Sequence, residues 1–185
     1  VFGRRLLVNT GTSLYEESDR RMHERGTSAH NTLQIKNINS SDVWKSFRVG
    51  KRAKIKKFNF NNEGKYLCLE ASHDGFKTWR NNFIHERFIK LSECEVIILD
   101  QVQNYSGAHT VRYHLHPNIR VSFEENKNRG IFINEDEKEI FWHVEADQVH
   151  IHEYEYVTQF GLLTKSKVIN LTSKNKNTIL KLNWM

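Results

Sequence analysis

The sequence predicts an all-β fold, a large antiparallel β-sandwich of one domain with very little helix. Apolar and polar residues alternate with a period of two in several runs, which is the pattern of strands that bury one face. Turn signals separate these runs, and the chain of 185 residues contains a single proline. Short strands with turns between them are typical of a sandwich or a barrel. No repeat or linker divides the sequence, so residues 1–185 are predicted to be one domain.

The predicted strands are spread over most of the chain. They cover residues 31–35, 83–91, 95–99, 111–117, 149–156 and 179–182. The turn signals lie at 61–64, 73–75, 106–107 and 128–130. The polar and charged stretch from Glu16 to Thr27 has no strand pattern, and we expect a long loop or one helical turn there.

Composition places the chain among folded globular proteins. It is 38% apolar and 27% charged, and its length is sufficient for one hydrophobic core. No window approaches ~18 consecutive apolar residues, so we expect no membrane span. The start at Val1 has no basic stretch followed by a long apolar run and is not a signal peptide. Gly3 fits a tight turn between two strands, and this opening predicts a piece of a larger protein.

The charge of the chain predicts an anionic partner. The net charge is +6 and the pI is about 9.3, which suits either nucleic acid or an acidic polysaccharide. The sequence offers no helix for a groove and no nucleic-acid-binding motif, so we expect no nucleic acid partner. Arg52, Lys54 and Lys56 would share one strand face, which either binds an anion or faces solvent.

The two cysteines, Cys68 and Cys94, each lie in an apolar, strand-like run. No Cys-x-x-Cys motif is present for zinc or redox chemistry. We expect two buried thiols, with a single disulfide as the alternative if the two strands pair.

Two pairs of histidines have a spacing that a metal site can use. His114 with His116, and His150 with His152, would place two imidazoles on one strand face, about 7 Å apart along the strand. Alternating strands also produce such pairs by chance, so hydrogen-bonded or surface histidines are the alternative.

An arginine-rich stretch precedes the first predicted strand. Arg20, Arg21 and Arg25 lie close in sequence to His23 and His30. Such a group is able to bind a carboxylate or a sulfate through guanidinium forks. The alternative is a loop in which the arginines form ion pairs with neighbouring acidic residues, namely Glu16, Glu17, Asp19 and Glu24.

The same region resembles the C-terminal domain of heparinase II/III-like proteins. The resemblance rests on residues 7–15, Arg21, Arg25, Ala29-His30-Asn31-Thr32, Glu70-Ala71-Ser72-His73-Asp74-Gly75-Phe76, His85-Glu86-Arg87, Asp100, His114-Leu115-His116-Pro117 and Phe160-Gly161. These segments follow the family's order along nearly the whole chain. The resemblance is specific for the family and not for a substrate.

The resemblance implies a polysaccharide lyase that joins an N-terminal α/α toroid to a large β-sandwich. Such enzymes cleave acidic, uronate-containing glycans by β-elimination, in which a base removes a proton and an acid protonates the leaving oxygen. The toroid and a His-x-His-x-Asp segment upstream of Val1 supply the chemical groups. No complete catalytic set is therefore expected in this chain, which should be inactive alone. The resemblance also implies a periplasmic or secreted protein.

The resemblance assigns four residues to substrate contact in the cleft between the two domains: Tyr15, Arg21, Arg25 and His30. It also implies a metal site, zinc or calcium, in which His30 and the residue at position 9 are ligands. The family has an aspartate at that position, whereas this chain has Asn9, and an amide is a poorer zinc ligand than a carboxylate. No cofactor is therefore certain, and a hydrogen-bonded His30 that orders the loop is the alternative.

Four further residues of the resemblance, His73, Asp74, His85 and Arg87, are expected to hold turns and strand pairs together.

A non-catalytic carbohydrate-binding module with the same sandwich is the alternative function. It predicts an exposed strip of aromatic side chains, for which the candidates are Trp44, Trp79, Trp142 and Trp184.

Overall fold

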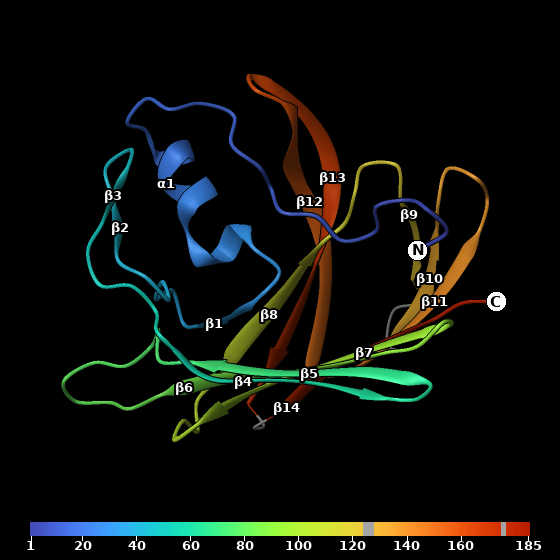
Figure 1. Ribbon diagram of the computed structural model, residues 1–185. Helices are drawn as coiled ribbons and strands as arrows, with labels where there is room; N and C mark the ends of the chain where they lie inside the picture. Colours follow the sequence, from blue (N-terminus) through green and yellow to red (C-terminus); the bar gives the residue numbers. More distant parts are fainter. Residues whose placement is uncertain (124–127, 175–176) are drawn as a thin grey trace.

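The computed structural model describes residues 1–123, 128–174 and 177–185, and it contains two antiparallel β-sheets (Figure 1). The larger sheet has eight strands in the order β4-β5-β6-β7-β14-β11-β10-β9, and the smaller has four in the order β1-β8-β13-β12. The predicted all-β sandwich with very little helix is confirmed. None of the helices in the described residues is long and apolar enough to span a membrane.

The strands of the larger sheet are β4 (Ile55–Glu63), β5 (Tyr66–His73), β6 (Ile84–Leu91), β7 (Glu95–Gln103), β9 (Arg120–Phe123), β10 (Arg129–Ile133), β11 (Glu139–Glu145) and β14 (Asn177–Asn183). Those of the smaller sheet are β1 (Leu33–Ile35), β8 (His109–His114), β12 (Gln148–Gln159) and β13 (Leu162–Ser173). A short hairpin pairs β2 (Val43–Trp44) with β3 (Arg48–Val49). The helical elements are α1 (Asp19–Arg25) and the 3-10 turn η1 (Thr27–Ala29).

The predicted strands correspond to β1, β6, β7, β8, β12 and β14. The predicted run 111–117 is shifted relative to β8, which covers His109–His114 and so begins two residues earlier and ends three residues earlier. Pro117 has no N–H to donate to a strand ladder, so the strand does not reach it. In the stretch 16–27, the helical alternative is right. Helix α1 begins after Ser18, whose side chain accepts a hydrogen bond from the backbone N–H of Arg21.

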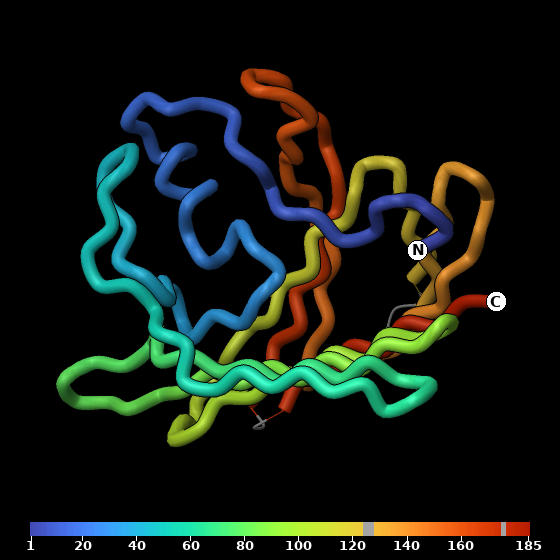
Figure 2. Tube along the Cα trace, in the orientation of Figure 1, coloured from blue at the N-terminus to red at the C-terminus, as the bar shows by residue number. Residues whose placement is uncertain are grey.

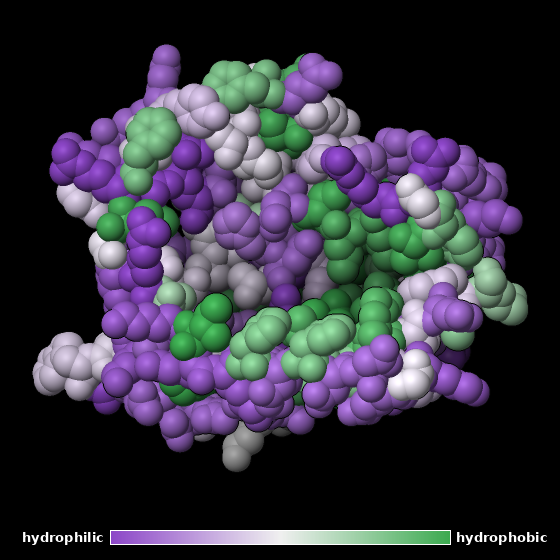
Figure 3. Space-filling model, in the orientation of Figure 1, coloured by the Kyte–Doolittle hydropathy of each residue, from purple (hydrophilic) through white to green (hydrophobic). Residues whose placement is uncertain are grey.

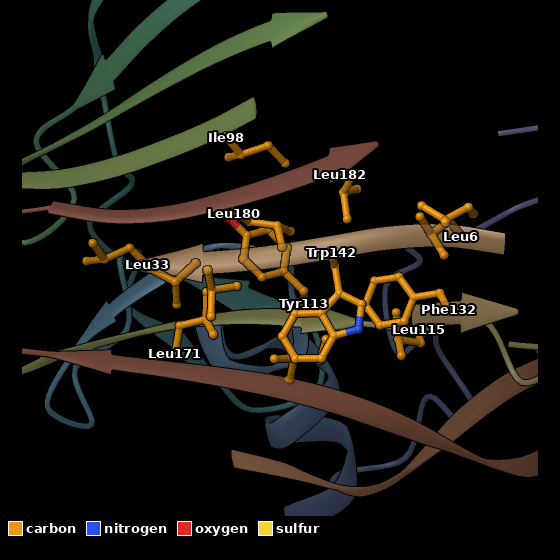
Figure 4. Close-up of a cluster of buried hydrophobic side chains, with 14 of the residues drawn as sticks. Leu6, Leu33, Ile98, Tyr113, Leu115, Phe132, Trp142, Leu171, Leu180 and Leu182 are labelled. Atoms are coloured by element: carbon orange, nitrogen blue, oxygen red, sulfur yellow. The ribbon is translucent and has the colours of Figure 1, made fainter. Parts of the chain in front are cut away.

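The hydrophobic core lies between the two sheets (Figure 4). Trp142 of β11 is 2% exposed and its ring stacks against those of Phe123 and Phe132, with ring centroids 5.5 and 5.6 Å away. From the smaller sheet, the side chains of Tyr113 and Leu171 reach the same cluster (Figure 4). The alternation of these residues with polar neighbours along each strand explains why the sheets face each other in this way.

The core face of the larger sheet is covered at one end only. Leu180, Ile98, Ile89, Leu69 and Phe60 lie opposite one another in a row across five neighbouring strands, so they share one face. Leu180 is 1% exposed, whereas Phe60 on edge strand β4 is 57% exposed. Apolar residues over β4 and β5 remain at the surface, and Figure 3 shows them along the lower rim and in the hollow behind it.

The two cysteines are free. Cys68 is buried, as predicted, but the prediction is wrong for Cys94, which is exposed in the turn between β6 and β7. The disulfide alternative is also wrong.

Candidate functional site

The N-terminal segment crosses the smaller sheet, and residues 9–15 lie at the upper end of that sheet (Figure 2). The N–H of Val8 donates to the carbonyl oxygen of His114 at 2.9 Å, and the N–H of Val157 donates to that of Thr10 at 2.8 Å. Gly11 has φ +91°, and a Cβ at this position would lie 2.7 Å from Cβ of Val157. Only glycine fits this close crossing.

Tyr15 stands at the centre of an exposed aromatic cluster. Its ring is 5.0 Å from Phe160 in the β12–β13 turn and 5.7 Å from Phe47 in the β2–β3 turn. The three residues are 54%, 62% and 67% exposed, in the order Tyr15, Phe160, Phe47. The guanidinium carbon of Arg21 lies 5.5 Å from the Tyr15 ring and 5.6 Å from the Phe47 ring. An apolar surface backed by a cation is suited to stacking against a sugar ring.

Arg21 and Arg25 fasten the β2–β3 hairpin to helix α1. Arg21 is 8% exposed and donates to the carbonyl oxygen of Ser46 at 3.1 Å and to Oγ1 of Thr12 at 3.3 Å. Arg25 donates to the carbonyl oxygens of Lys45 at 2.5 Å and Arg48 at 2.9 Å. The structure therefore gives both guanidinium groups backbone partners, and their contact with a substrate stays a prediction.

Arg20, in contrast, forms one ion pair that the alternative interpretation predicted, with Glu24, and one that it did not, with Glu155. Its Nε lies 3.2 Å from Oε1 of Glu24, and its Nη1 lies 2.6 Å from Oε2 of Glu155. Glu24 is 5% exposed and also accepts a hydrogen bond from the backbone N–H of Ser13 at 3.0 Å. This pairing holds α1 against the loop that carries Tyr15.

His30 and Asn9 lie side by side, as the resemblance implied. Nδ1 of His30 is 3.2 Å from Oδ1 of Asn9. Because an amide oxygen only accepts, Nδ1 carries the proton in the neutral ring and Nε2 carries the lone pair. Burial, and then the nearby His23, lower the pKa of His30, so the ring is neutral near pH 7.

The donors in this chain do not make a metal centre by themselves. His30 and Asn9 supply one imidazole nitrogen and one neutral amide oxygen. In residues 1–123, 128–174 and 177–185, no group of three or more His, Cys, Asp or Glu side chains is placed to hold a metal ion. A zinc or calcium ion at this position stays a prediction.

Asn31, the residue after His30, joins the crossing segment to both sheets. Its Oδ1 accepts from the backbone N–H of His114 at 2.7 Å and lies 3.1 Å from Nδ1 of the same residue. Its Nδ2 donates to the carbonyl oxygen of Val8 at 3.1 Å, and its own carbonyl oxygen accepts from Nη1 of Arg87 at 2.6 Å. The position of His30 is thus fixed by its neighbour.

Below Asn31 lies a buried ionic network centred on Asp100, which is 0% exposed. Arg87 binds this carboxylate with two hydrogen bonds, of 2.8 and 2.9 Å, and Nε2 of His85 lies 2.6 Å from it. The hydroxyl of Tyr113 donates to it at 3.2 Å. Burial alone would raise the pKa of Asp100, but Arg87 and His85 outweigh burial and bring it to about 2.

A chain of two histidines continues this network to the β5 turn. His85 donates through Nε2 to Asp100, so in the neutral ring its Nδ1 accepts from Nε2 of His73, 3.0 Å away. Nδ1 of His73 then accepts from the N–H of Gly75 at 3.1 Å. Asp74 accepts from the N–H of Lys54 at 2.8 Å. The expected structural role of His73, Asp74, His85 and Arg87 agrees with these contacts.

The family described as heparinase II/III-like, C-terminal, matches residues 1–185. The chain belongs to this family. A search of the curated proteins found no match.

Solved structures show the same fold. The chain is similar to heparan sulfate lyase HepC from Pedobacter heparinus, with a TM-score of 0.73 and 16% identity over 98% of this chain. It is also similar to the BT4657 gene product, a heparinase III, with a TM-score of 0.76 and 17% identity over 99% of this chain. A further heparinase III matches with a TM-score of 0.72 and 17% identity over 97% of this chain. In each case the chain spans 28% of the other protein's length.

The tryptophans named for the alternative function do not form one strip. Trp142 lies in the core, whereas Trp44 and Trp79 are 43% and 86% exposed. The guanidinium groups of Arg48 and Arg80 lie over these two rings, at 4.7 and 4.1 Å.

Sequence reasoning missed Phe47 as a neighbour of Tyr15, and it named Phe160 only within the resemblance. The two phenylalanines are far apart in the sequence, and only the β2–β3 and β12–β13 turns bring them to Tyr15. No local pattern carries such a signal.

Proposed function

We propose that this chain is the C-terminal β-sandwich domain of a polysaccharide lyase that cleaves acidic, uronate-containing glycans by β-elimination. The family match over the whole chain carries the proposal. The heparan sulfate lyases that share the fold support a sulfated, uronate-containing substrate, and hence an acidic polysaccharide as partner. The positive net charge of the domain suits such a polymer.

Tyr15, Arg21, Arg25 and His30 form this domain's side of the substrate cleft in our proposal. The ring of Tyr15 stacks on the apolar face of a pyranose, and Arg21 behind it adds positive charge close to the uronate. Neutralising the uronate carboxylate favours removal of the adjacent proton. His30 offers the lone pair of Nε2 to a substrate hydroxyl, while Asn9 holds its Nδ1. Arg25 keeps the hairpin with Phe47 in place.

The remaining chemical groups come, in our proposal, from an N-terminal α/α toroid of the same protein. The solved heparinases are longer than this chain, which spans 28% of their length. The uncovered core face over β4 and β5 supports a further part of the protein that packs there. Phe58 and Phe60 are 62% and 57% exposed on this face, which is unusual for phenylalanines that extend a core row. Because its polymeric substrate cannot enter cells, we propose a periplasmic or secreted enzyme.

Lyase activity tests the proposal through the unsaturated uronate that β-elimination creates, which absorbs in the ultraviolet. We expect no rise in absorbance when the 185-residue chain is incubated with heparan sulfate, alginate or hyaluronan. We expect a rise with at least one of them when the toroid is present. Activity of the chain alone, or no activity with the toroid, contradicts the proposal.

Two matched variants distinguish the lyase cleft from a carbohydrate-binding module. In the protein with its toroid, Tyr15→Ala should raise KM by about tenfold, the effect of losing one aromatic–sugar contact. Trp79→Ala removes a more exposed ring away from the proposed cleft and should change KM by less than about twofold. The reverse result favours the binding module, in which the exposed tryptophans hold the glycan.

A further inference from the structure

The outer face of the smaller sheet is polar and carries no carboxylate. Val111 and Tyr113 of β8, and Ile169 and Leu171 of β13, point into the core, so residues of even number point outward from these strands and from β12. Up to the register shift after Val157, the outward positions are Thr110, Arg112, His114, Gln148, His150, His152, Tyr154, Tyr156, Thr164, Ser166, Val168, Asn170 and Thr172, of which His114, Tyr156, Ser166 and Val168 are buried. None of them is Asp or Glu.

One row of this face places a cation, an amide and a histidine next to one another. Arg112 of β8 is opposite Asn170 of β13, which is opposite His150 of β12. Directly opposite residues have their Cβ atoms about 5 Å apart. His152 follows on the same face, about 7 Å along the strand from His150. Both histidines are exposed, so a ligand can reach the row from solvent.

The described residues place no carboxylate against this row. Arg112 donates to Oε1 of Gln34, a neutral group, at 2.8 Å. The acidic residues of β12 alternate with its outward histidines and have partners elsewhere: Glu153 pairs with Lys165 at 3.2 Å, and Glu155 pairs with Arg20 at 2.6 Å. The positive charge of the row is therefore available for an anion from outside.

Asn170, in the middle of the row, has a side-chain amide oxygen without a hydrogen-bond donor among the described residues. This Oδ1 atom is buried. Such an unpaired acceptor is unfavourable inside a protein. Turning the amide would present its NH2 group to an anion held between Arg112 and His150.

We propose that Arg112, Asn170, His150 and His152 form a subsite for a sulfate or carboxylate group of an acidic glycan. The class of ligand rests on the proposed function, whereas the anion preference rests on the row itself. Arginine and amide N–H groups donate to both anions, and histidine does so when protonated. The subsite would hold the polymer on a second surface of the domain, apart from Tyr15.

Binding at this subsite should strengthen as the pH falls. Burial, and then the positive charges of Arg112 and His150, lower the pKa of His152. A bound anion opposes these effects and favours the protonated ring, so binding takes up a proton. The other titratable groups that act on this face, His23, His30 and His114, are also cationic when protonated and none of them opposes the trend.

The test compares two double variants, each of which removes one arginine and one histidine from cross-strand positions. Arg112→Gln/His150→Gln changes the proposed row. Arg129→Gln/His143→Gln changes an exposed pair on β10 and β11 of the other sheet. Binding of a heparan sulfate oligosaccharide is measured by titration calorimetry at about pH 7.5 and 5.5. A non-sulfated oligosaccharide with the same uronate backbone, measured in parallel, distinguishes a sulfate from a carboxylate ligand.

We expect the row variant to bind about tenfold more weakly, which is the effect of losing one charge-assisted hydrogen bond, and the control variant to change by less than about twofold. His150→Gln/His152→Gln, which alters only exposed side chains, should keep binding at the higher pH and lose its increase at the lower pH. Equal losses in the row and control variants, or no loss in either, overturn the proposal.

Lyase activity of the same proteins separates this proposal from the function on which it rests. If the wild-type protein cleaves the glycan and the row variant binds and cleaves it equally well, only the subsite is wrong. If the row variant loses binding while even the wild-type protein with its toroid cleaves nothing, the subsite stands and the lyase function is wrong.

Discussion

Replacing Asp100 by Asn should strongly destabilise the domain. Asp100 is fully buried and accepts two hydrogen bonds from Arg87 and one each from His85 and Tyr113. In Asp100→Asn the amide NH2 group would face these donors, and the Arg87 guanidinium would lose its counter-ion. Breaking one partner out of a buried ion pair costs about 3–5 kcal/mol. A domain is typically stable by only about 5–15 kcal/mol, so this is a large fraction.

Urea unfolding, followed by tryptophan fluorescence, measures this change. With a slope of about 2–3 kcal/mol per molar urea, the midpoint should fall by about 1–2.5 M. The matched control is Asp136→Asn, because Asp136 pairs with Arg4 at 2.8 Å on the exposed surface, where solvent screening leaves such a pair little effect on stability.

A double variant tests the reason for the destabilisation. If the unpaired buried charge causes it, Arg87→Met/Asp100→Leu should recover part of the lost stability, because neither charge remains. The reasoning is refuted if Asp100→Asn and Asp136→Asn unfold at the same urea concentration.

Two further predictions concern stability. Burial, then Arg112, lower the pKa of His114 to about 3, and burial, then His85, lower that of His73 to about 4. Both rings stay neutral in the folded protein, whereas they protonate near pH 6.5 in the unfolded chain. The folding stability that this pKa difference contributes is therefore complete above pH 6.5 and is lost as the pH falls towards 4. Each ring should lower the unfolding free energy measured across this range by roughly 3 kcal/mol, or roughly 6 kcal/mol for the two, and a flat profile contradicts the assignment. Gly11→Ala should cost about 2–4 kcal/mol through its positive φ and its clash, whereas Gly64→Ala, with open space around it, should cost about 1 kcal/mol through its positive φ alone. Equal thermal shifts of the two variants would disprove the close crossing.

The sequence was sufficient to predict the fold class because strand alternation is a local signal. It does not predict the order of the strands, since the pairing of β7 with β14 joins segments that are far apart along the chain. The prediction for Cys94 failed for a related reason. The apolar run that follows it forms β7, but Cys94 itself lies one residue before that strand, in an exposed turn.

The candidate site was predicted in part. Proximity of His30 and Asn9 followed from the resemblance, and the 3.2 Å contact agrees with it. The backbone partners of Arg21 and Arg25 could not be predicted, because a carbonyl oxygen is present at every residue and leaves no mark in the sequence. Sequence composition suggested acidic partners for all three arginines, and only Arg20 has them in the described part of the chain.

The place of β14 in the larger sheet has a consequence for synthesis of the protein. This strand, Asn177–Asn183, lies between β7 and β11, so it joins two half-sheets that the ribosome has already produced. Until it emerges, β7 and β11 each present an unpaired strand edge, which is a site for aggregation. The nascent chain therefore cannot complete its larger sheet before residues 177–183 have been synthesised, and a deletion of this strand would leave two separate half-sheets.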